Sequence, residues 1–463
     1  MKLKKITAAV CAAALALGAA GLPVSDVFGG EFAVTASAAD EIIANGTCGE
    51  NVKWQLDSAG TLTISGTGEM EDYGEASETP WYSYKKDIKK AVIAKGVTSI
   101  GDCSFSGFSL ESFSIAGSVK IIGEYAFYDS GSFTEINIPE GVETIKEGAF
   151  ANNNGRNIKL SLPSTLRTLE DGGIGGISHT GVFFRTGITN AYLPEGLTYT
   201  GQYTFSECSR LKNVTLPKTL ERIGEGCFRR CGKLESITIP SSVKRIDEGA
   251  FQNSGLLSVK IPDSVTETGR MAFSSCSNLK SITFSKNSKV LNSTCTSCNS
   301  LESVTIPEGV TKLNGTFNYC SNLSSITLPN TLTTIDRAFD DCSRLMSVTV
   351  PKSVTYIDGL GIRDQLWQTP YEDFVISCYR NSEAQTYAEK KGIKYVLLDG
   401  DTVNGDLNGD GAVDVDDVIL AQKAAAGWKV SAEVRAAADV DGNGSVDPGD
   451  LIWIQKKAAG WKV

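Results

Sequence analysis

Histidine is almost absent from this chain of 463 residues, which contains only His179. A lone imidazole cannot hold zinc by itself, and no serine or cysteine stands beside it as a partner for nucleophilic catalysis. His179 belongs to the glycine-rich insertion DGGIGGISHTG, which lacks the GKS or GKT of a phosphate-binding loop. We interpret the insertion as a surface feature without catalytic chemistry.

The sequence also lacks an excess of positive charge. It has 44 lysines and arginines against 54 aspartates and glutamates, a formal net charge of −10. Nucleic-acid binding needs a basic face that displaces the counterions of the phosphates, and no basic patch with interleaved aromatic residues is present. The acidic residues, in turn, do not recur as a readable catalytic pair. The composition therefore argues against nucleic acid as a partner.

No apolar run reaches the length of about 20 residues that a membrane span requires. The apolar run ITAAVCAAALALGAAG follows three lysines near the N-terminus, and the small-residue stretch TASAAD supplies an A-x-A cleavage site ending at Ala38 or Ala39. This order predicts a secretory signal peptide over residues 1–39. A membrane anchor is disfavoured by the short run, and a lipid anchor at Cys11 by the bulky Val10 before it. We predict a secreted, extracellular protein.

Most of the remaining sequence is an internal repeat. The dipeptide Ile/Leu/Val-Pro returns every 22 to 24 residues, except for one interval of 31, and gives about twelve copies. In the copy CGKLESITIPSSVKRIDEGAF, residues 231–251, apolar residues alternate with Ser236 and Thr238 up to Pro240, which predicts a strand that ends at the proline. One such copy cannot bury its apolar face alone, so we expect the copies to stack into a mainly β solenoid.

These IP, AF and C-x-x-L patterns resemble the BspA-like leucine-rich repeats of bacterial surface proteins. The resemblance covers residues 90–398 and implies a leucine-rich repeat solenoid that binds a protein or cell-surface ligand. Residues 40–89, with GTLTISGTGEMEDY and PWYSY, resemble the β-rich flank that precedes such repeats. The stretch VISCYRNSEAQTYAEKKGIKYVLL resembles a terminal unit in which a short helix closes the open end.

Cysteines follow the register of the repeat. Eleven would remain after removal of the signal peptide, and six of them stand three residues before a repeat leucine: Cys208, Cys231, Cys276, Cys298, Cys320 and Cys342. Buried free cysteine behaves as a small hydrophobic residue, so we expect this column to fill a narrow inward slot. The CTSC sequence could indicate redox chemistry, but alignment with the next copy puts Cys295 in the phenylalanine position of Phe317. Some disulfide bridges within the column remain possible.

The outward strand positions are mostly serine and threonine, with Tyr192 as the clearest outward aromatic residue. Surfaces that bind sugars usually carry several exposed aromatic rings. We therefore favour protein recognition by the repeats over polysaccharide binding, which stays open as an alternative.

The C-terminal stretch DLNGDGAVDVDD, residues 406–417, has the spacing of a calcium loop. Oxygen ligands are expected at loop positions 1, 3, 5, 7, 9 and 12, with Gly411 allowing the sharp turn at position 6. The expected metal ligands are Asp406, Asn408, Asp410, the carbonyl of Ala412, Asp414 and Asp417.

A second loop, DVDGNGSVDPGD, lies 33 residues further on and is followed by the same sequence, QK-x-x-A-G-W-K-V. Its expected ligands are Asp439, Asp441, Asn443, the carbonyl of Ser445, Asp447 and Asp450. A disordered acidic tail would not be expected to repeat in phase in this way. We predict two Ca²⁺ ions and a helix after each loop.

This unit resembles a type I dockerin, a small all-α calcium-binding domain that docks into cohesin domains of cellulosome scaffoldins. The resemblance places the linker at residues 399–404 and the dockerin at 405–463. It implies cohesin contacts at Val415, Asp416, Gln422 and Lys423 in the first copy, and at Pro448, Gly449, Gln455 and Lys456 in the second. Many dockerins carry Ser-Thr-like pairs at loop positions 10 and 11, where this chain has Val-Asp and Pro-Gly, so the type of cohesin and the use of two orientations stay open.

Together these features predict a non-catalytic cellulosome component in a polysaccharide-degrading complex. The alternatives are a dockerin-borne carbohydrate-active enzyme and a polysaccharide-binding module. The enzyme is disfavoured because the repeats occupy nearly all of the chain between the signal peptide and the dockerin.

Overall fold

The computed structural model describes residues 41–131, 133–155, 157–173, 180–361, 371–399, 404–408 and 412–461. The predicted signal peptide, His179, Asp410, Gly411 and most of the predicted linker lie outside the described residues. Within them, no helix is long and apolar enough to cross a membrane.

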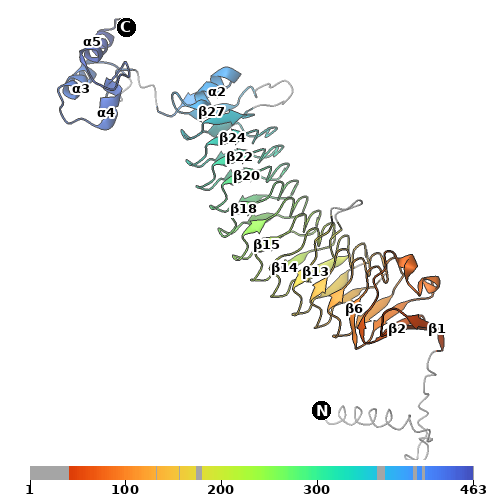
Figure 1. The fold of residues 1–463 in the computed structure, drawn as a ribbon. Helices are drawn as coiled ribbons and strands as arrows, with labels where there is room; N and C mark the ends of the chain where they lie inside the picture. The colour runs from red at the N-terminus through yellow and green to blue at the C-terminus, as the bar shows by residue number, and fades with distance from the viewer. Residues whose placement is uncertain are drawn as a thin grey trace, which may run out of the picture. The chain divides into compact units, whose positions relative to one another are not determined.

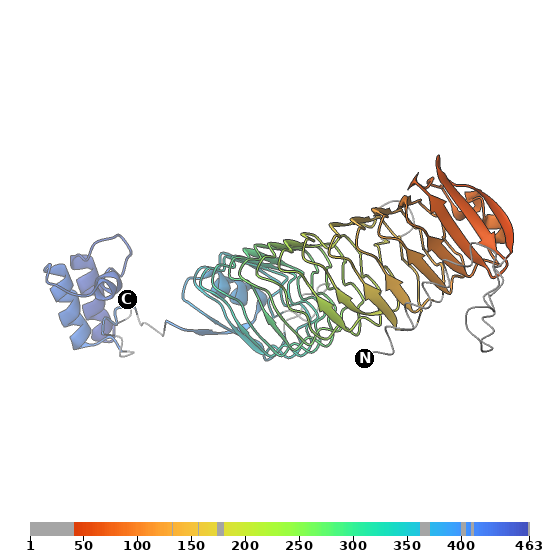
Figure 2. The ribbon, with the colours of Figure 1, turned by 90° about the horizontal axis from the view of Figure 1, so that it is seen from below.

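The repeats form a mainly β solenoid of about 13 turns, as the periodicity predicts (Figures 1 and 2). One row of short strands comes from the Ile-Pro part of each coil, and its paired strands run parallel, in register. The burial alternates along each strand, so that one face enters the core and the other meets solvent. This row consists of β5(Lys90–Ile93), β7(Ser112–Ile115), β9(Glu135–Asn137), β11(Ile158–Ser161), β13(Ile188–Tyr192), β14(Asn213–Thr215), β17(Ser258–Lys260), β19(Ser281–Thr283), β21(Ser303–Thr305), β23(Ser325–Thr327), β25(Ser347–Thr349), β27(Val375–Cys378) and β28(Lys394–Leu397).

A second row of shorter parallel strands was not predicted from the sequence. Most of its strands lie after the proline of a coil and bury one apolar residue, such as Ile223 or Ile246. A pattern of two or three residues is too short to show periodicity. The row consists of β4(Gly68–Glu69), β6(Val97–Ile100), β8(Ile121–Ile122), β10(Thr144–Ile145), β12(Thr168–Leu169), β15(Arg222–Ile223), β16(Arg245–Ile246), β18(Glu267–Thr268), β20(Val290–Asn292), β22(Lys312–Asn314), β24(Thr334–Asp336) and β26(Tyr356–Asp358).

The prediction of a strand in the copy at residues 231–251 is wrong, although its predicted burial pattern is confirmed. Residues 234–239 form no strand, although Leu234 and Ile239 are buried and Ser236 and Thr238 are exposed, as the alternation requires. The alternation of buried and exposed residues does not require strand hydrogen bonds, because packing of the apolar side chains into the core is enough to produce it.

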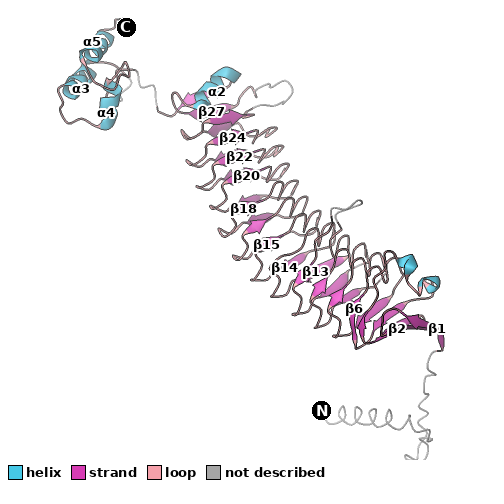
Figure 3. Ribbon diagram, in the orientation of Figure 1, coloured by secondary structure: helices cyan, strands magenta, loops and turns pink. Residues whose placement is uncertain are grey.

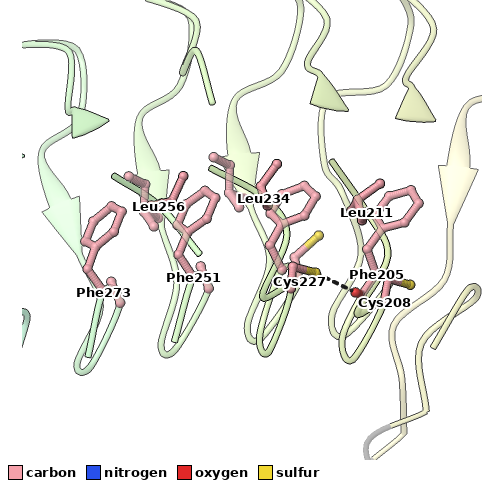
Figure 4. Packing of buried hydrophobic residues seen from close by; sticks show 14 of the residues in the cluster. Phe205, Cys208, Leu211, Cys227, Leu234, Phe251, Leu256 and Phe273 are labelled. Atoms are coloured by element: carbon pink, nitrogen blue, oxygen red, sulfur yellow. Dashed lines mark hydrogen bonds between the residues drawn. The ribbon is translucent and has the colours of Figure 1, made fainter. Parts of the chain in front are cut away.

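A column of aromatic rings runs through the core (Figure 4). Phe205, Phe228, Phe251 and Phe273 come from successive coils, and their ring centroids are 5.7, 5.4 and 5.2 Å apart in nearly parallel stacks. Each ring is fully buried. Because each of these coils adds one ring to the stack, neighbouring coils share a continuous core.

The cysteine column lies beside these rings, and the prediction that it fills a buried slot is confirmed. All six column cysteines are buried, and the eleven cysteines of the described residues are free thiols. Each column thiol donates to the carbonyl of the residue in the ring position one coil earlier; the Sγ of Cys231, for example, lies 3.1 Å from the carbonyl oxygen of Phe205. Burial raises the pKa of the Cys208 thiol to about 11 and that of Cys276 to about 12, so both stay protonated at neutral pH.

Cys295 replaces a phenylalanine, as its alignment with Phe317 predicts. Its backbone N–H bonds to Thr316 at 2.9 Å, just as that of Phe273 bonds to Thr294. Cys295 is fully buried, and burial raises its pKa. The packing interpretation of CTSC therefore fits the structure better than the redox interpretation.

The N-terminal flank covers the first coil. The antiparallel pair β2(Val52–Asp57) and β3(Thr61–Gly66) continues into the first strand row through β5, and β1(Ile42–Thr47) lies at its edge. Two 3-10 turns, η3(Ala76–Glu78) and η4(Tyr82–Tyr84), flank Trp81, whose indole stacks on Phe105 at 5.8 Å and donates to the carbonyl of Ser104 at 3.1 Å. Trp81 thus closes the ring column at this end.

The helix α2(Glu383–Lys391) covers the last coils. Ser382 accepts a hydrogen bond from the N–H of Gln385 at its start, and Gly392 ends it in the left-handed conformation at φ 68°. Tyr387 on its buried face donates to the carbonyl of Leu360 at 3.1 Å. The helix therefore shields apolar surface that the next coil would otherwise cover.

The C-terminal residues form a separate small helical body (Figure 3). It contains α3(Val415–Ala425), α4(Ala432–Ala438) and α5(Pro448–Ala458). Both helices predicted to follow the loops are present, whereas the short α4 before the second loop was not predicted. The core is small, with five buried apolar side chains: Leu407, Ala421, Ala424, Ala438 and Ile454.

Candidate calcium loops and docking faces

The second acidic loop brings its carboxylates together. Asp439, Asp441 and Asp450 offer oxygen atoms that all lie within 4.8 Å of one another. Asn443 joins them, since its Nδ2 donates to Asp441 at 2.9 Å and to Asp447 at 3.5 Å. Five of the six predicted ligand residues of this loop thus converge through their side chains, and Ser445 lies in the same turn.

Asp450, at the last loop position, holds the loop to the start of α5. Its Oδ1 accepts the N–H of Val440 at 2.9 Å and of Asp441 at 3.4 Å, and its Oδ2 accepts the N–H of Asp447 at 2.8 Å. Asp447 is also the N-cap of α5, and with Asp450 it forms a capping box. Asp450 is buried, and its carboxylate ties the first residues of the loop to the start of α5.

The described part of the first loop repeats this arrangement. Asp417 is fully buried and accepts the N–H groups of Leu407, Asn408 and Asp414 at 2.5, 3.0 and 2.9 Å. Asp414 is the N-cap of α3 and forms the same capping box. Asp406 is buried beside Leu407, whereas Asn408 and Ala412 are exposed. The two loops are therefore built alike where both are described.

These residues fit a divalent cation. Two carboxylates at 4.8 Å repel each other by about 1 kcal/mol even at the dielectric constant of water, and more in a partly buried site. Among the described residues, no ion pair joins a lysine or arginine to Asp439, Asp441 or Asp450. Clustered carboxylate and amide oxygens with backbone carbonyls are the ligand set that Ca²⁺ prefers.

The residues expected at a partner interface lie on two exposed surfaces. Val415, Asp416, Gln422 and Lys423 are exposed on α3, and Pro448, Gly449, Gln455 and Lys456 are exposed on α5. Val415 is 67% exposed, which is unusual for a β-branched apolar residue on a helix. Because α3 and α5 pack against each other, each presents one copy of the same set of positions to solvent.

Four further exposed apolar residues on these surfaces were missed in the sequence analysis. Ile419 and Ile452 lie one helical turn after Val415 and Pro448, with 42% and 51% of their surface exposed. Trp428 and Trp461 follow the helices and are both 65% exposed. The repeated AGWKV sequence was the available signal, but only the helix packing shows that these rings stay outside the core.

The structure also places the serines and threonines of the repeats on the exposed strand face. Residues of equal position pair in register, for example Ser303 with Ser325 and Thr305 with Thr327. Tyr192 is 63% exposed on the same row, as predicted. This face is the second candidate surface of the protein.

Comparison with protein families decides the identity of both parts. The model of the BspA type leucine rich repeat region matches residues 79–176, 177–257 and 244–360, more than half of the chain. The chain belongs to the BspA-type leucine-rich repeat family. The dockerin type I domain model matches residues 404–457, so this family member carries a type I dockerin.

Solved structures similar to this leucine-rich repeat protein include three from bacteria. A leucine-rich repeat protein from Eubacterium ventriosum is 23% identical, with 68% of this chain and 94% of that chain covered at a TM-score of 0.46. One from Bacteroides ovatus is also 23% identical, with 70% and 100% covered at a TM-score of 0.42. The pneumococcal vaccine antigen PcpA is 14% identical, with 77% and 99% covered at a TM-score of 0.37. A search of curated proteins gives no match.

The two families define the protein in general terms. A type I dockerin is a cohesin-binding module of the cellulosome type, and such domains generally bind calcium. Leucine-rich repeats mediate protein interactions, and neither family is catalytic. Both families are typical of extracellular or cell-surface proteins.

Proposed function

We propose that this protein is a secreted, non-catalytic component of a cellulosome, anchored by a calcium-dependent dockerin. The main support is that the two acidic loops are built alike: Asp417 and Asp450 each accept hydrogen bonds from backbone N–H groups of their own loop. The repeats present a binding surface for a protein or cell-surface ligand.

Two Ca²⁺ ions complete the dockerin in this proposal, one in each loop. The ligands are the twelve residues predicted from the sequence. Bound calcium supplies positive charge among the carboxylates; the protein supplies the fold that orients them. Since the described part of the helical body has only five buried apolar side chains, calcium binding contributes a large part of its folding free energy.

The cohesin contacts are the exposed positions of α3 and α5. Val415, Asp416, Gln422 and Lys423 form one face; Pro448, Gly449, Gln455 and Lys456 form the other. An apolar centre is added by Ile419 on the first face and by Ile452 on the second, and an aromatic edge by Trp428 and Trp461 in the same order. These side chains matter because buried aromatic and aliphatic anchors carry most of the binding energy of an interface.

The test is a binding assay of the full chain against the scaffoldin cohesins of its source organism. Binding is expected in Ca²⁺ and is expected to be lost in excess chelator. Ile419→Asp and Ile452→Asp in one chain should abolish binding, because a charge then stands at the centre of either face. A matched control, Lys390→Gln on α2, removes an exposed helical charge outside the dockerin and should bind normally.

Failure of the wild-type chain to bind every such cohesin in Ca²⁺ would refute the anchoring role. Export is tested separately by N-terminal sequencing of the secreted protein, which should begin within a residue of Asp40.

A further inference from the structure

A hollow lies on the strand face of the repeats between β23 and β25, toward the C-terminal end of the solenoid. The hollow has a volume of about 200 Å³ and is lined by Ile326, Thr327, Leu328, Asn330, Thr349, Pro351 and Tyr379. It lies where β23 and β25 belong to different sheets. At about 30 Å³ for each water molecule, the hollow holds roughly seven waters, about the space of one sugar ring.

The lining combines one aromatic ring with hydrogen-bonding groups and carries no ionised side chain. Lys352 places its Nζ 4.9 Å from the centroid of the Tyr379 ring and so helps to fix the ring. Asn330 is fixed as well, because its backbone N–H bonds to Glu308 at 3.0 Å and its Nδ2 reaches the same oxygen at 3.4 Å. A fixed ring beside neutral polar groups suits a ligand with an apolar face and many hydroxyls.

Two columns of hydroxyls lead along the strand face to this hollow. Paired strands lie about 4.8 Å apart, so in the β21–β23 pair, where Ser303 lies beside Ser325 and Thr305 beside Thr327, the hydroxyls stand at about that spacing. All eight side chains are exposed, and among the described residues none of their hydroxyls has a hydrogen-bond partner within the protein. The columns are Ser281, Ser303, Ser325 and Ser347, and Thr283, Thr305, Thr327 and Thr349.

Hydroxyls at other positions of the solenoid coils form hydrogen bonds within the protein. Thr165, Thr219 and Thr331 each donate to a carbonyl of the preceding coil, at 2.8, 3.0 and 2.9 Å. Those hydroxyls stabilise the stacking of the coils. The columns on the strand face leave both their donors and their acceptors available to a ligand.

We propose that the hollow binds one ring of a neutral carbohydrate chain, which continues along the serine and threonine columns. Sugar hydroxyls both donate and accept hydrogen bonds, as the column hydroxyls do, and the ring of Tyr379 covers an apolar sugar face. Serine and threonine are under-represented among the residues that dominate protein interfaces, so this part of the face suits a glycan better than a protein. The inference rests on the proposed role of the repeats and names its ligand class.

The test is calorimetric titration of the full chain with soluble hexasaccharides. Cellohexaose, xylohexaose and mannohexaose represent plant glycans, and the hexamer of N-acetylglucosamine represents bacterial cell-wall glycans. The hexamer of galacturonic acid is the charged control. We expect millimolar binding of at least one neutral chain, since a single shallow ring site offers few contacts. This binding should persist in chelator.

Substitutions locate the site. Thr327→Val and Thr349→Val should each weaken binding about five-fold through the loss of one hydrogen bond. Tyr379→Ala should weaken it about ten-fold or more. Thr215→Val and Tyr192→Ala make the same changes on the same strand row away from the hollow, and they should bind like the wild type.

Each outcome decides the proposal. No heat with any neutral hexasaccharide at tens of millimolar, or binding that is unchanged in all three hollow variants, overturns it. The proposal is also overturned if these variants weaken the binding of a purified cell-surface protein and leave glycan binding intact. Because the same samples are assayed for cohesin binding in Ca²⁺, loss of the glycan site is distinguishable from loss of the anchoring role.

Discussion

Replacing Asp450 by alanine should unfold the dockerin even in the presence of calcium. The carboxylate accepts two short hydrogen bonds from Val440 and Asp447 at 2.9 and 2.8 Å, and a longer one from Asp441. A hydrogen bond to a charged group contributes about 1.5 to 3 kcal/mol, so the two short bonds together contribute about 3 to 6 kcal/mol. A domain of this size with a single small core is stable by about 3 to 5 kcal/mol, which the loss matches.

The effect is measured by calorimetry and far-ultraviolet circular dichroism of the full chain in saturating Ca²⁺. Asp450→Ala should lose the dockerin transition and the helical signal of α3 and α5, and limited trypsin digestion should cut at Lys423 and Lys456. The solenoid transition should stay unchanged, because the solenoid has its own core.

Asp441→Ala is the matched variant. Asp441 is also an expected calcium ligand, but it is exposed, and within the described part of the chain it accepts hydrogen bonds only from the neighbouring Asn443. It should weaken calcium affinity and lower stability by about 1.4 kcal/mol for each ten-fold loss of affinity. If Asp450→Ala melted like the wild type, or no worse than Asp441→Ala, the structural role of the buried carboxylate would be refuted.

Three further predictions concern calcium and the solenoid core. In calorimetry, excess chelator should remove the thermal unfolding transition of the dockerin, and with it cohesin binding, while the transition of the solenoid persists. A melting profile that does not change with chelator would contradict the coupling of metal binding and folding. Phe228→Ala should destabilise the solenoid by about 3 to 5 kcal/mol in urea titrations, because loss of the fully buried ring leaves a cavity between Phe205 and Phe251. As a control, the exposed Tyr192→Ala should change stability by less than about 0.5 kcal/mol. Burial raises the pKa of Cys276 and Cys342 to about 12, against about 8.5 in an unfolded chain. Their contribution to stability should therefore be complete below about pH 8.5 and should decline as the pH rises toward 12. A thiol reagent at pH 8 should modify the two cysteines only after denaturation.

The sequence predicted the repeat architecture because its determinants are local and recur. Each Ile-Pro stop and each cysteine three residues before a leucine marks the same place in a coil, so repetition compensates for the weakness of any single copy. The acidic loops were readable for the same reason, since calcium ligands must stand at fixed steps along the chain.

The second strand row was not readable from the sequence. A strand such as Arg245–Ile246 buries one apolar residue and is defined by its neighbours in the adjacent coils. The missing strand at residues 234–239 makes the opposite point, since its alternation is as regular as in any other copy. Strand geometry there depends on how neighbouring coils approach, which no single copy encodes.

The sequence by itself determined the period of the coils, the stacking of their buried residues and the order of oxygen atoms in two candidate calcium loops, because each depends on residue types at fixed spacings. The tertiary structure alone decided which apolar residues stay outside the cores, as with Ile419 and Trp428, and where the strand face opens into a hollow beside Tyr379. Exposure and concavity are properties of how distant segments pack together, and the spacing of residues along one segment does not contain that information.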